Sequence, residues 1–376
     1  MKTGWETKKL GDLFDITSSK RVFKSEWKQE GVPFYRAREI VKLANQGFVD
    51  NELFISQEMF DEYSAKSGIP QEGDIMVTGV GTLGICYVVR RNDRFYFKDG
   101  NIIWLKKVSD ASSRFVEYAF QSDFIRKQID DSVGATVGTF TIIKAKNTLI
   151  PIPPLTEQQR IVAILDEAFD GIATATANAE QNLQNARALF ESYLDAVFRQ
   201  RGEGWVEKRL EDVCVLQRGF DLPTRSRVQG EFPLVSSSGI IDTHNKGPVK
   251  GPGVATGRSG SIGNVFFVEE DYWPLNTVLY VKQFHGNSPR FVYRLLKHFD
   301  LKRFASGAGV PTLNRNFVHD ELVTVPKSKT MQDRIAERLD EIEQETQRLE
   351  TIYQRKLAAL DELKQSLLHQ AFAGDL

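Results

Sequence analysis

The sequence Thr156-Glu157-Gln158-Gln159-Arg160-Ile161 returns 174 residues later as Thr330-Met331-Gln332-Asp333-Arg334-Ile335. The same offset carries apolar positions of the first copy onto apolar positions of the second, over 43 residues without a gap: Leu165 onto Leu339, Leu189 onto Leu363, Leu194 onto Leu368 and Phe198 onto Phe372. The chain therefore contains an internal repeat, and the repeated stretch decides how the rest is organised.

Both copies, residues 156–198 and 330–372, have the pattern of a long helix with a narrow apolar seam. Apolar or small residues recur at spacings of four and three, at Ile161, Leu165, Ala168, Ile172, Ala175, Ala179, Ala186, Leu189 and Tyr193, and again at Ile335, Leu339, Ile342, Leu349, Tyr353, Leu360, Leu363 and Leu367. Such a seam is typical of a helix that packs against another helix. At about 1.5 Å per residue each helix would extend roughly 65 Å, which favours a spacer.

We expect the two helices to form an antiparallel coiled coil, because small residues then face large ones and polar residues face polar ones. The predicted register pairs Ala168 with Leu360, Ala179 with Leu349 and Asn182 with Thr346. One pair in this register, Ile172 with Lys356, matches poorly.

The blocks that precede the two helices are also related. Residues 5–13 (WETKKLGDL) return as 205–213 (WVEKRLEDV), and the glycine-containing segments 73–84 and 134–140 return as 251–263 and 307–313. Aromatic and β-branched runs predict strands at 85–89, 95–97, 102–105, 265–268 and 278–281, with helical stretches at 114–128 and 289–304. The predicted fold is α+β, a pseudo-twofold repeat with blocks at 1–155 and 201–328 alternating with helices at 156–200 and 329–376.

The entry to each long helix has start signals. Prolines at 151, 153 and 154 disfavour an earlier helix, so we expect Thr156 to cap the first helix with Gln159 at the capping-box position. Thr330 and Asp333 repeat the arrangement in the second copy.

Composition places the chain among ordinary globular proteins. Its 376 residues suggest two or three domains, and it is 41% hydrophobic and 26% charged. There is no apolar run of membrane-spanning length and no apolar signal core at the amino terminus, so we expect a cytoplasmic protein without membrane association. The two cysteines, Cys86 and Cys214, are isolated, which excludes a disulfide framework.

The charge is divided between blocks and helices. The net charge is +2 for residues 1–155 and +4 for 201–328, but −4 for 156–200 and −3 for 329–376. Positive blocks and acidic helices favour blocks that meet a polyanion and helices that do not.

No pattern of catalytic or metal-binding residues stands out. Gly79-Val80-Gly81-Thr82-Leu83-Gly84 matches the dinucleotide-binding fingerprint, but a strand rather than a helix follows it, which favours a structural turn. The five histidines are scattered without a metal-ligand spacing. We therefore expect no catalytic residue, no metal and no cofactor in this chain.

The repeat, the two blocks and three short motifs resemble the specificity subunit of type I restriction–modification systems. The motifs are the openings at Trp5 and Trp205, the run Pro153-Pro154-Leu155-Thr156-Glu157-Gln158-Gln159-Arg160-Ile161, and the closing Gln370-Ala371-Phe372-Ala373-Gly374-Asp375-Leu376. The second helix departs from the run after Thr330. Family chains often end in this way, so we expect the unit to be complete.

The resemblance implies a non-catalytic DNA reader. Residues 1–155 and 201–328 would be target-recognition domains that each read one half of a bipartite, asymmetric site, and helix length would set the gap. The helices would dock two methyltransferase (M) subunits, which would bring S-adenosylmethionine, and a motor-nuclease (R) subunit would join for restriction.

The residue types that contact DNA edges and phosphates identify candidate binding residues. Arginine reads guanine, asparagine reads adenine, and both lysine and arginine hold phosphates. The candidates are Lys20, Arg21, Lys24, Arg36 and Arg38 in the first block, and Arg218, Arg225, Arg227, Arg258, Ser259, Asn314, Arg315 and Asn316 in the second.

Two other functions remain open at this point. A non-catalytic coiled-coil scaffold that binds proteins would show no salt-dependent affinity for DNA. An enzyme that used the turn at residues 79–84, for instance a methyltransferase, would modify DNA without a partner.

Overall fold

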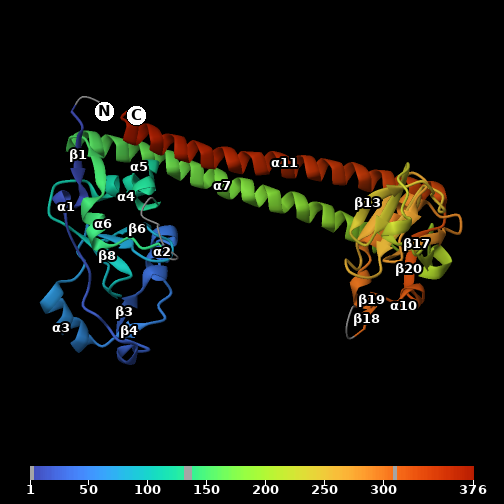
Figure 1. The fold of residues 1–376 in the computed structure, drawn as a ribbon, viewed down its shortest axis with the longest axis horizontal. Coiled ribbons are helices and arrows are strands. Elements are labelled where there is room, and N and C mark those ends of the chain that lie inside the picture. Colours follow the sequence, from blue (N-terminus) through green and yellow to red (C-terminus); the bar gives the residue numbers. More distant parts are fainter. Residues whose placement is uncertain (1–3, 131–137, 308–310) are drawn as a thin grey trace. The chain divides into compact units, whose positions relative to one another are not determined.

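The computed structural model describes residues 4–130, 138–307 and 311–376. Residues 134–137 and 308–310 of the predicted repeat thus lie outside the described residues. The chain forms two compact units (Figure 1): the first unit is Met1–Asn178 together with Lys356–Leu376, and the second unit is Ala179–Arg355. Each unit contains one block and one part of each long helix.

The first unit has a four-stranded antiparallel sheet in the order β2-β8-β5-β6 (Phe14–Thr17, Ile102–Lys107, Ile75–Thr78 and Cys86–Val88). A smaller sheet, β4-β3-β7 (Phe54–Ile55, Val32–Tyr35 and Tyr96–Phe97), includes the parallel pair β3 and β7. Strand β1 (Glu6–Lys9) pairs with β9 (Leu149–Ile152). The block's helices are α1 (Leu10–Leu13), α2 (Ala37–Gln46), α3 (Gln57–Ser67), α4 (Ser113–Gln121), α5 (Asp123–Asp130) and α6 (Ile142–Asn147), and η1 (Lys24–Glu26) is a 3₁₀ turn.

The second unit repeats this plan. Its four-stranded antiparallel sheet has the order β11-β17-β14-β15 (Val215–Arg218, Val278–Gln283, Gly253–Gly257 and Val265–Val268). The smaller sheet is β13-β12-β16 (Gly239–His244, Phe232–Ser236 and Trp273–Pro274), again with one parallel pair. The other pairs are β10 (Trp205–Arg209) with β20 (Leu322–Pro326) and β18 (Ala305–Ser306) with β19 (Thr312–Leu313). Its helices are α8 (Leu210–Val213), α9 (Pro289–His298) and α10 (Arg315–His319), with 3₁₀ turns η2 (Thr224–Ser226) and η3 (Leu301–Phe304).

Strands β5 and β14, which occupy equivalent central places in the two larger sheets, are buried throughout and pack on both faces. Ile75 and Val77 of β5 pack into the core with Phe115 of α4, whereas Met76 packs on the opposite face with Trp104. In the second unit the neighbouring residues of β14 divide in the same way between two cores. The units differ most beside the smaller sheet, where the first has α2 and α3 and the second has the β12–β13 hairpin.

The glycine-rich segment 79–84 joins two antiparallel strands, β5 and β6, and no helix follows it. Gly81 and Gly84 have φ values of 71° and 70°, and the equivalent Gly260 and Gly263 of the second unit both have 81°. Positive φ is the conformation that glycine adopts without steric cost. The interpretation as a structural turn is confirmed.

The two predicted long helices are α7 (Leu155–Phe198) and α11 (Lys329–Ala373). In the first unit the beginning of α7 and the end of α11 share a core that contains Ile161, Leu165, Leu368 and Phe372. In the second unit the end of α7 and the beginning of α11 share a core that contains Leu194, Phe198, Ala336 and Leu339. The two helices are therefore antiparallel, as predicted.

Two contacts between the helices fall outside the predicted register, but each is made by a long side chain that reaches along its own helix, so the register itself stays a prediction. It places Phe169 opposite Ala359, but the Phe169 ring lies 5.2 Å from the Nζ atom of Lys364. Likewise it places Arg187 opposite Glu341, but Arg187 Nε donates to Glu350 at 2.9 Å.

The apolar seam also leaves the predicted positions along α7. Leu189 and Tyr193 are 69% and 36% exposed, whereas Leu194 and Val197 are buried. A helix of 3.6 residues per turn drifts by about 20° per heptad relative to a strict seven-residue repeat, so the buried stripe moves to the next residue.

The same drift affects α11. Leu363 is 47% exposed, while Leu368 is buried. Lys356 is exposed and Leu357 is partly buried in its place, so the poor match predicted for Lys356 does not arise.

The predicted helix caps are displaced. Helix α7 begins at Leu155, one residue before Thr156, and α11 begins at Lys329. The carbonyl groups of Pro154 and Ser328 accept the first backbone hydrogen bonds of the two helices. Thr156 and Thr330 are helical and exposed, so neither is a cap.

Within the described ranges, no helix has both the length and the apolar composition that a bilayer crossing requires.

Candidate nucleic-acid interface

Five of the predicted DNA-binding residues of the second unit surround one hollow of about 450 Å³. Arg218 ends β11, Arg258 follows β14, and Asn314, Arg315 and Asn316 form the start of α10. The hollow is completed by Leu279, Ser306, Thr312 and Leu313. The fold thus collects three guanidinium groups and two amides that are up to 98 positions apart in the sequence.

Neighbouring groups hold these side chains in place. Arg218 donates from Nη2 to Asp221 at 2.8 Å, and this contact, with a hydrogen bond from Asn276, lowers the pKa of the Asp221 carboxyl. Arg315 Nη1 donates to the carbonyl of Leu216 at 3.3 Å. Asn314 caps α10 by accepting the Asn316 N–H at 3.1 Å. Only part of each arginine's hydrogen-bonding capacity is used, and five donors per guanidinium leave several for a ligand.

The remaining candidates of the second unit do not line this hollow. Ser259 bridges to Thr312 in the backbone and so supports one wall of the hollow. Arg225 is exposed in η2, and Arg227 follows it with its Nε atom buried and without a hydrogen-bond partner among the described residues.

The first unit has a hollow of about 600 Å³ in the equivalent place. Its lining includes Thr139, Phe140, Thr141, Ile142 and Ile143, which align with residues 312–316 of the second unit at an offset of 173. At this offset Asn314 corresponds to Thr141, Arg315 to Ile142 and Asn316 to Ile143. Ile143 is 74% exposed, so it presents apolar surface to any molecule that enters.

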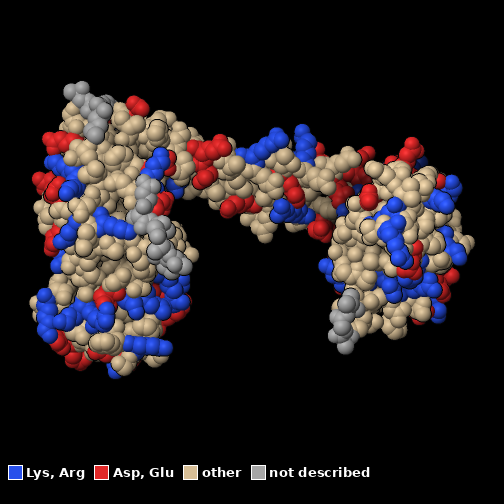
Figure 2. All heavy atoms as spheres, viewed as in Figure 1, with Lys and Arg blue, Asp and Glu red and all other residues tan. Residues whose placement is uncertain are grey.

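Lys20 and Arg21 lie in the loop that follows β2, and Lys24 begins the 3₁₀ turn η1. Tyr96 Oη contacts the backbone nitrogen of Lys20 at 2.9 Å, and Arg21 Nε donates to Asp99 at 3.0 Å. The side chains of Lys20, Arg21 and Lys24 are exposed. Figure 2 shows Lys and Arg side chains gathered on the part of the first unit that carries β3, β4 and α3.

Arg36 and Arg38 are engaged in ion pairs at the start of α2. Arg36 donates to Glu39 from Nε at 3.1 Å and from Nη2 at 2.9 Å, and Arg38 contacts both Glu39 and Glu52. Burial raises the pKa of Glu39, but the hydrogen bonds from both arginines outweigh it and bring the pKa below its ordinary value. The positive charges of these two arginines are already compensated by Glu39 and Glu52, so the arginines attract a phosphate less strongly than Lys20 or Lys24.

The sequence reading missed residues 139–143 of the first unit. The signal was available, because residues 314–316 had been selected and the repeat relates them to 141–143. Residues 139–143 have no charged or amide side chain, the two types that mark the candidates in the second unit.

Neither reactive thiols nor a metal site appears in the described part of the chain. Cys86 and Cys214 are free and buried, and burial raises the pKa of the Cys214 thiol to about 12. No group of three or more His, Cys, Asp or Glu residues is placed to hold a metal ion among the residues described.

Comparisons with known proteins agree with the repeat. The model of the type I restriction modification DNA specificity domain matches residues 2–185 and again residues 202–357. A putative type I restriction enzyme specificity subunit of Haemophilus influenzae is 30% identical over 185 residues, which is 49% of this chain. The alignment spans 45% of that relative, less than half its length.

Two solved structures show the same fold over the whole chain. One chain, from a study of complex assembly and conformational transition in a type I R-M system, is 20% identical with a TM-score of 0.76, covering 100% of this chain and 99% of that one. The other, the HsdS subunit of Thermoanaerobacter tengcongensis, is 18% identical with a TM-score of 0.63, covering 100% and 98%.

Proposed function

Because the chain belongs to the type I restriction–modification DNA specificity family, we propose that it is the non-catalytic subunit that selects the DNA site in such a system. Each recognition domain, residues 1–155 and 201–328, reads one half of a bipartite site. The observation that carries the proposal is the pair of equivalent hollows, which occupy the same place in two copies of one fold but have different chemistry.

The second hollow suits guanine and adenine edges. A guanidinium donates to O6 and N7 of guanine, and an amide both donates to and accepts from adenine. Arg258, Arg315 and Asn316 supply these groups around one hollow. Lysines and arginines nearby, such as Arg225, would hold phosphates and fix the register.

The first hollow suits thymine. Ile142 and Ile143 offer apolar contact to a thymine methyl group, and the hydroxyl groups of Thr139 and Thr141 can bond to a base edge. Lys20, Arg21 and Lys24 would hold the phosphates of this half-site, with Arg36 and Arg38 farther along the block. The two half-sites therefore differ, and the complete site is asymmetric.

The outer faces of the long helices suit two copies of one partner. Leu189 and Tyr193 form an exposed apolar pair one turn apart on α7. At the offset of 174, Leu363 of α11 is exposed as well, whereas Leu367 is partly buried against the core of the first unit. Leu189 and Leu363 are exposed at equivalent places on the two helices, and equivalent surfaces bind equivalent subunits, so each leucine docks one methyltransferase subunit. Those subunits bring S-adenosylmethionine and the methyl-transfer chemistry, and a motor-nuclease subunit joins the complex for restriction.

The length of α7 and α11 fixes the gap between the half-sites, because each helix belongs partly to both units. A rigid helix transmits position more faithfully than a loop, and helix length converts directly into distance along DNA.

Exchange of residues 1–155 for the corresponding block of another family member tests the proposal. Mapping of methylated adenines in cells with the full system should show one changed half-site, while the other half-site and the gap stay the same. Changes in both half-sites would reject the modular assignment. A complex without salt-dependent affinity for duplex DNA would favour the scaffold instead.

A further inference from the structure

A buried glutamine joins the first recognition domain to the start of its long helix. The side chain of Gln158, on α7, is only 3% exposed. Its Oε1 accepts the backbone N–H of Ser112 at 2.8 Å, and its Nε2 donates to the carbonyl of Pro153 at 2.8 Å. Ser112 is the cap of α4, and Pro153 follows β9. One amide thus links three chain segments.

The second unit has the same arrangement. Gln332 of α11 is 1% exposed, accepts the N–H of Ser288 at 2.8 Å and donates to the carbonyl of Pro326 at 2.8 Å. Ser288 caps α9, the equivalent of α4. Gln332 gains one further bond, to Asn287 at 2.7 Å, where the first unit has Ala111. The two recognition domains differ in their hollows, yet the hydrogen bonds of the glutamine to a serine N–H and to a proline carbonyl occur in both.

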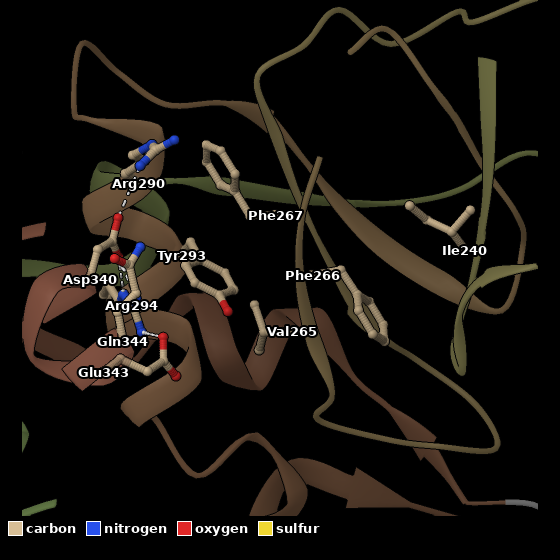
Figure 3. Close-up of a pocket in the computed structure, with 10 residues that line it drawn as sticks. All are labelled: Ile240, Val265, Phe266, Phe267, Arg290, Tyr293, Arg294, Asp340, Glu343 and Gln344. Carbon is tan, nitrogen blue, oxygen red and sulfur yellow. Dashed lines mark hydrogen bonds and ion pairs between the residues drawn. The ribbon is translucent and has the colours of Figure 1, made fainter. Parts of the chain in front are cut away.

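An ion pair makes a second attachment farther along each helix. Arg114 of α4 donates to Asp166 of α7 at 2.9 Å from Nη2. In the second unit Arg290 donates to Asp340 at 3.0 Å, and Figure 3 shows Arg290 and Arg294 of α9 facing Asp340 and Glu343 of α11. Two attachments about two turns apart prevent both rotation about the helix axis and sliding along it.

We propose that Gln158 and Gln332 are positioning residues that clamp each recognition domain to its own helix in one orientation, and that this clamp restricts the complex to one gap length. The inference rests on the proposed function, because a gap exists only if both domains read DNA. A long helix can fix the spacing between two recognition domains only if neither domain rotates relative to the helix.

Glutamine suits this position because its amide both accepts and donates. Glutamate could accept the serine N–H but would set a carboxylate against the proline carbonyl. Leucine fills a similar volume but leaves a buried N–H and a buried carbonyl without partners, so the domain would turn to rehydrate them. The sequence neighbour Gln159 is exposed and offers a matched control.

The test measures gap tolerance in the complete complex. A plasmid library carries the two half-sites mapped for the wild-type system, with the gap changed one base pair at a time. The full chain, with its methyltransferase subunits, is tested as wild type, Gln158→Leu, Gln332→Leu and the controls Gln159→Leu and Gln347→Leu, both at exposed positions. The readout is the methylated fraction at each gap length.

We expect the wild type and both controls to methylate one gap length. In both clamp variants, the ratio of methylation at the correct gap to methylation at a gap one base pair longer or shorter should fall about tenfold. The half-site sequences should stay unchanged. A uniform fall of methylation at all gap lengths, with the profile still sharp, would show that the glutamines only stabilise the fold and would overturn the clamp. A wild-type profile without preference would reject the proposed function itself, and the clamp with it.

A substitution in the exposed Arg114–Asp166 ion pair provides a second test if a leucine variant fails to fold. The Asp166 side chain is 42% exposed, so Asp166→Asn weakens the ion pair to Arg114 without opening the core. A broadened gap profile in Asp166→Asn supports the clamp, and a profile as sharp as that of the wild type overturns it.

Discussion

Under the proposed function, Arg315 is the position at which the two recognition domains differ most in chemistry. It occupies the place of Ile142 in the first unit, and its guanidinium is held by the Leu216 carbonyl with other donors left to bind. Replacement of a bidentate base contact relaxes recognition of one base pair rather than weakening binding uniformly.

We predict that Arg315→Ala weakens binding to the specific site about tenfold to a hundredfold and relaxes one position of the half-site read by residues 201–328. The measurement is binding of the assembled complex to duplexes mutated singly in each half-site. Lys250→Ala, which removes an exposed cation from the same unit, should leave the preference intact. Equal weakening on all sequences would instead assign Arg315 to a phosphate.

We expect His319 to make the stability of the second unit depend on pH. Its Nε2 accepts the N–H of Leu216 at 2.9 Å, which requires a neutral ring. Burial lowers the pKa of His319 below its ordinary value of 6.5; Glu211 and Asp320 oppose the shift, and Arg315 adds to it. A histidine with a depressed pKa contributes stability that is complete above pH 6.5 and is lost as the pH falls through the lowered value.

We therefore expect the melting temperature of the wild type to fall between pH 7.5 and pH 5.5 by more than that of His319→Gln, whose amide can still accept the Leu216 N–H. His369→Gln, at an exposed position of α11, should keep the wild-type slope. If His319→Gln and the wild type have identical pH dependence, the histidine is not the titrating group.

The role of Gln158 could not be predicted from the sequence. The repeat shows that the segment around Thr156 occurs twice in the chain, and periodicity places this segment at the start of a helix. Capping rules direct attention to Thr156 and Gln159, which are both exposed. The partner of Gln158, Ser112, is 46 residues away, and only the fold brings the two together.

At the scale of the element, the long helices carry one exposed leucine at the same place in each repeat. Leu189 is 69% exposed and its equivalent Leu363 is 47% exposed, although both were expected inside the seam. Large apolar side chains that recur in equivalent places on an otherwise polar helix indicate a binding surface.

We predict that Leu189→Lys together with Leu363→Lys reduces capture of the methyltransferase subunits at least tenfold, because a desolvated apolar contact becomes a buried charge. Co-purification with the tagged chain measures the loss. Ile352→Lys is the control, since Ile352 is 45% exposed but its equivalent, Asn178, is polar. Undiminished capture by the double variant would place the docking surface elsewhere.

Periodicity predicted both helices, and the complementary sizes of facing residues predicted their antiparallel sense, but the buried stripe departs from the predicted seam at several positions. The alternation of four and three cannot follow the drift of a real helix, so Tyr193 was assigned inward and Val197 was overlooked. Strands were easier, because β15 and β17 coincide with aromatic and β-branched runs. The bases of the DNA target stay outside the reach of sequence, since hollow geometry decides which groups converge.

At the scale of the whole molecule, the two helices belong to both units, which makes their length a property that can be varied. We predict that seven residues inserted into both helices, after Asn178 and after Arg355, lengthen the gap by about three base pairs and leave both half-sites unchanged. A heptad preserves the seam. Methylation mapping measures the gap, and the same insertion in the connection at residues 201–204 should not alter it.

The first unit is assembled from both ends of the polypeptide, whereas the second is one continuous stretch. Trp5 and Phe372 both pack on Phe115, so two residues 367 positions apart in the sequence meet around a single ring. During synthesis the second unit can close once residue 355 has emerged, while the first must wait for the last helical turns. A premature stop codon within residues 356–376 would therefore leave the second unit complete and remove part of the first.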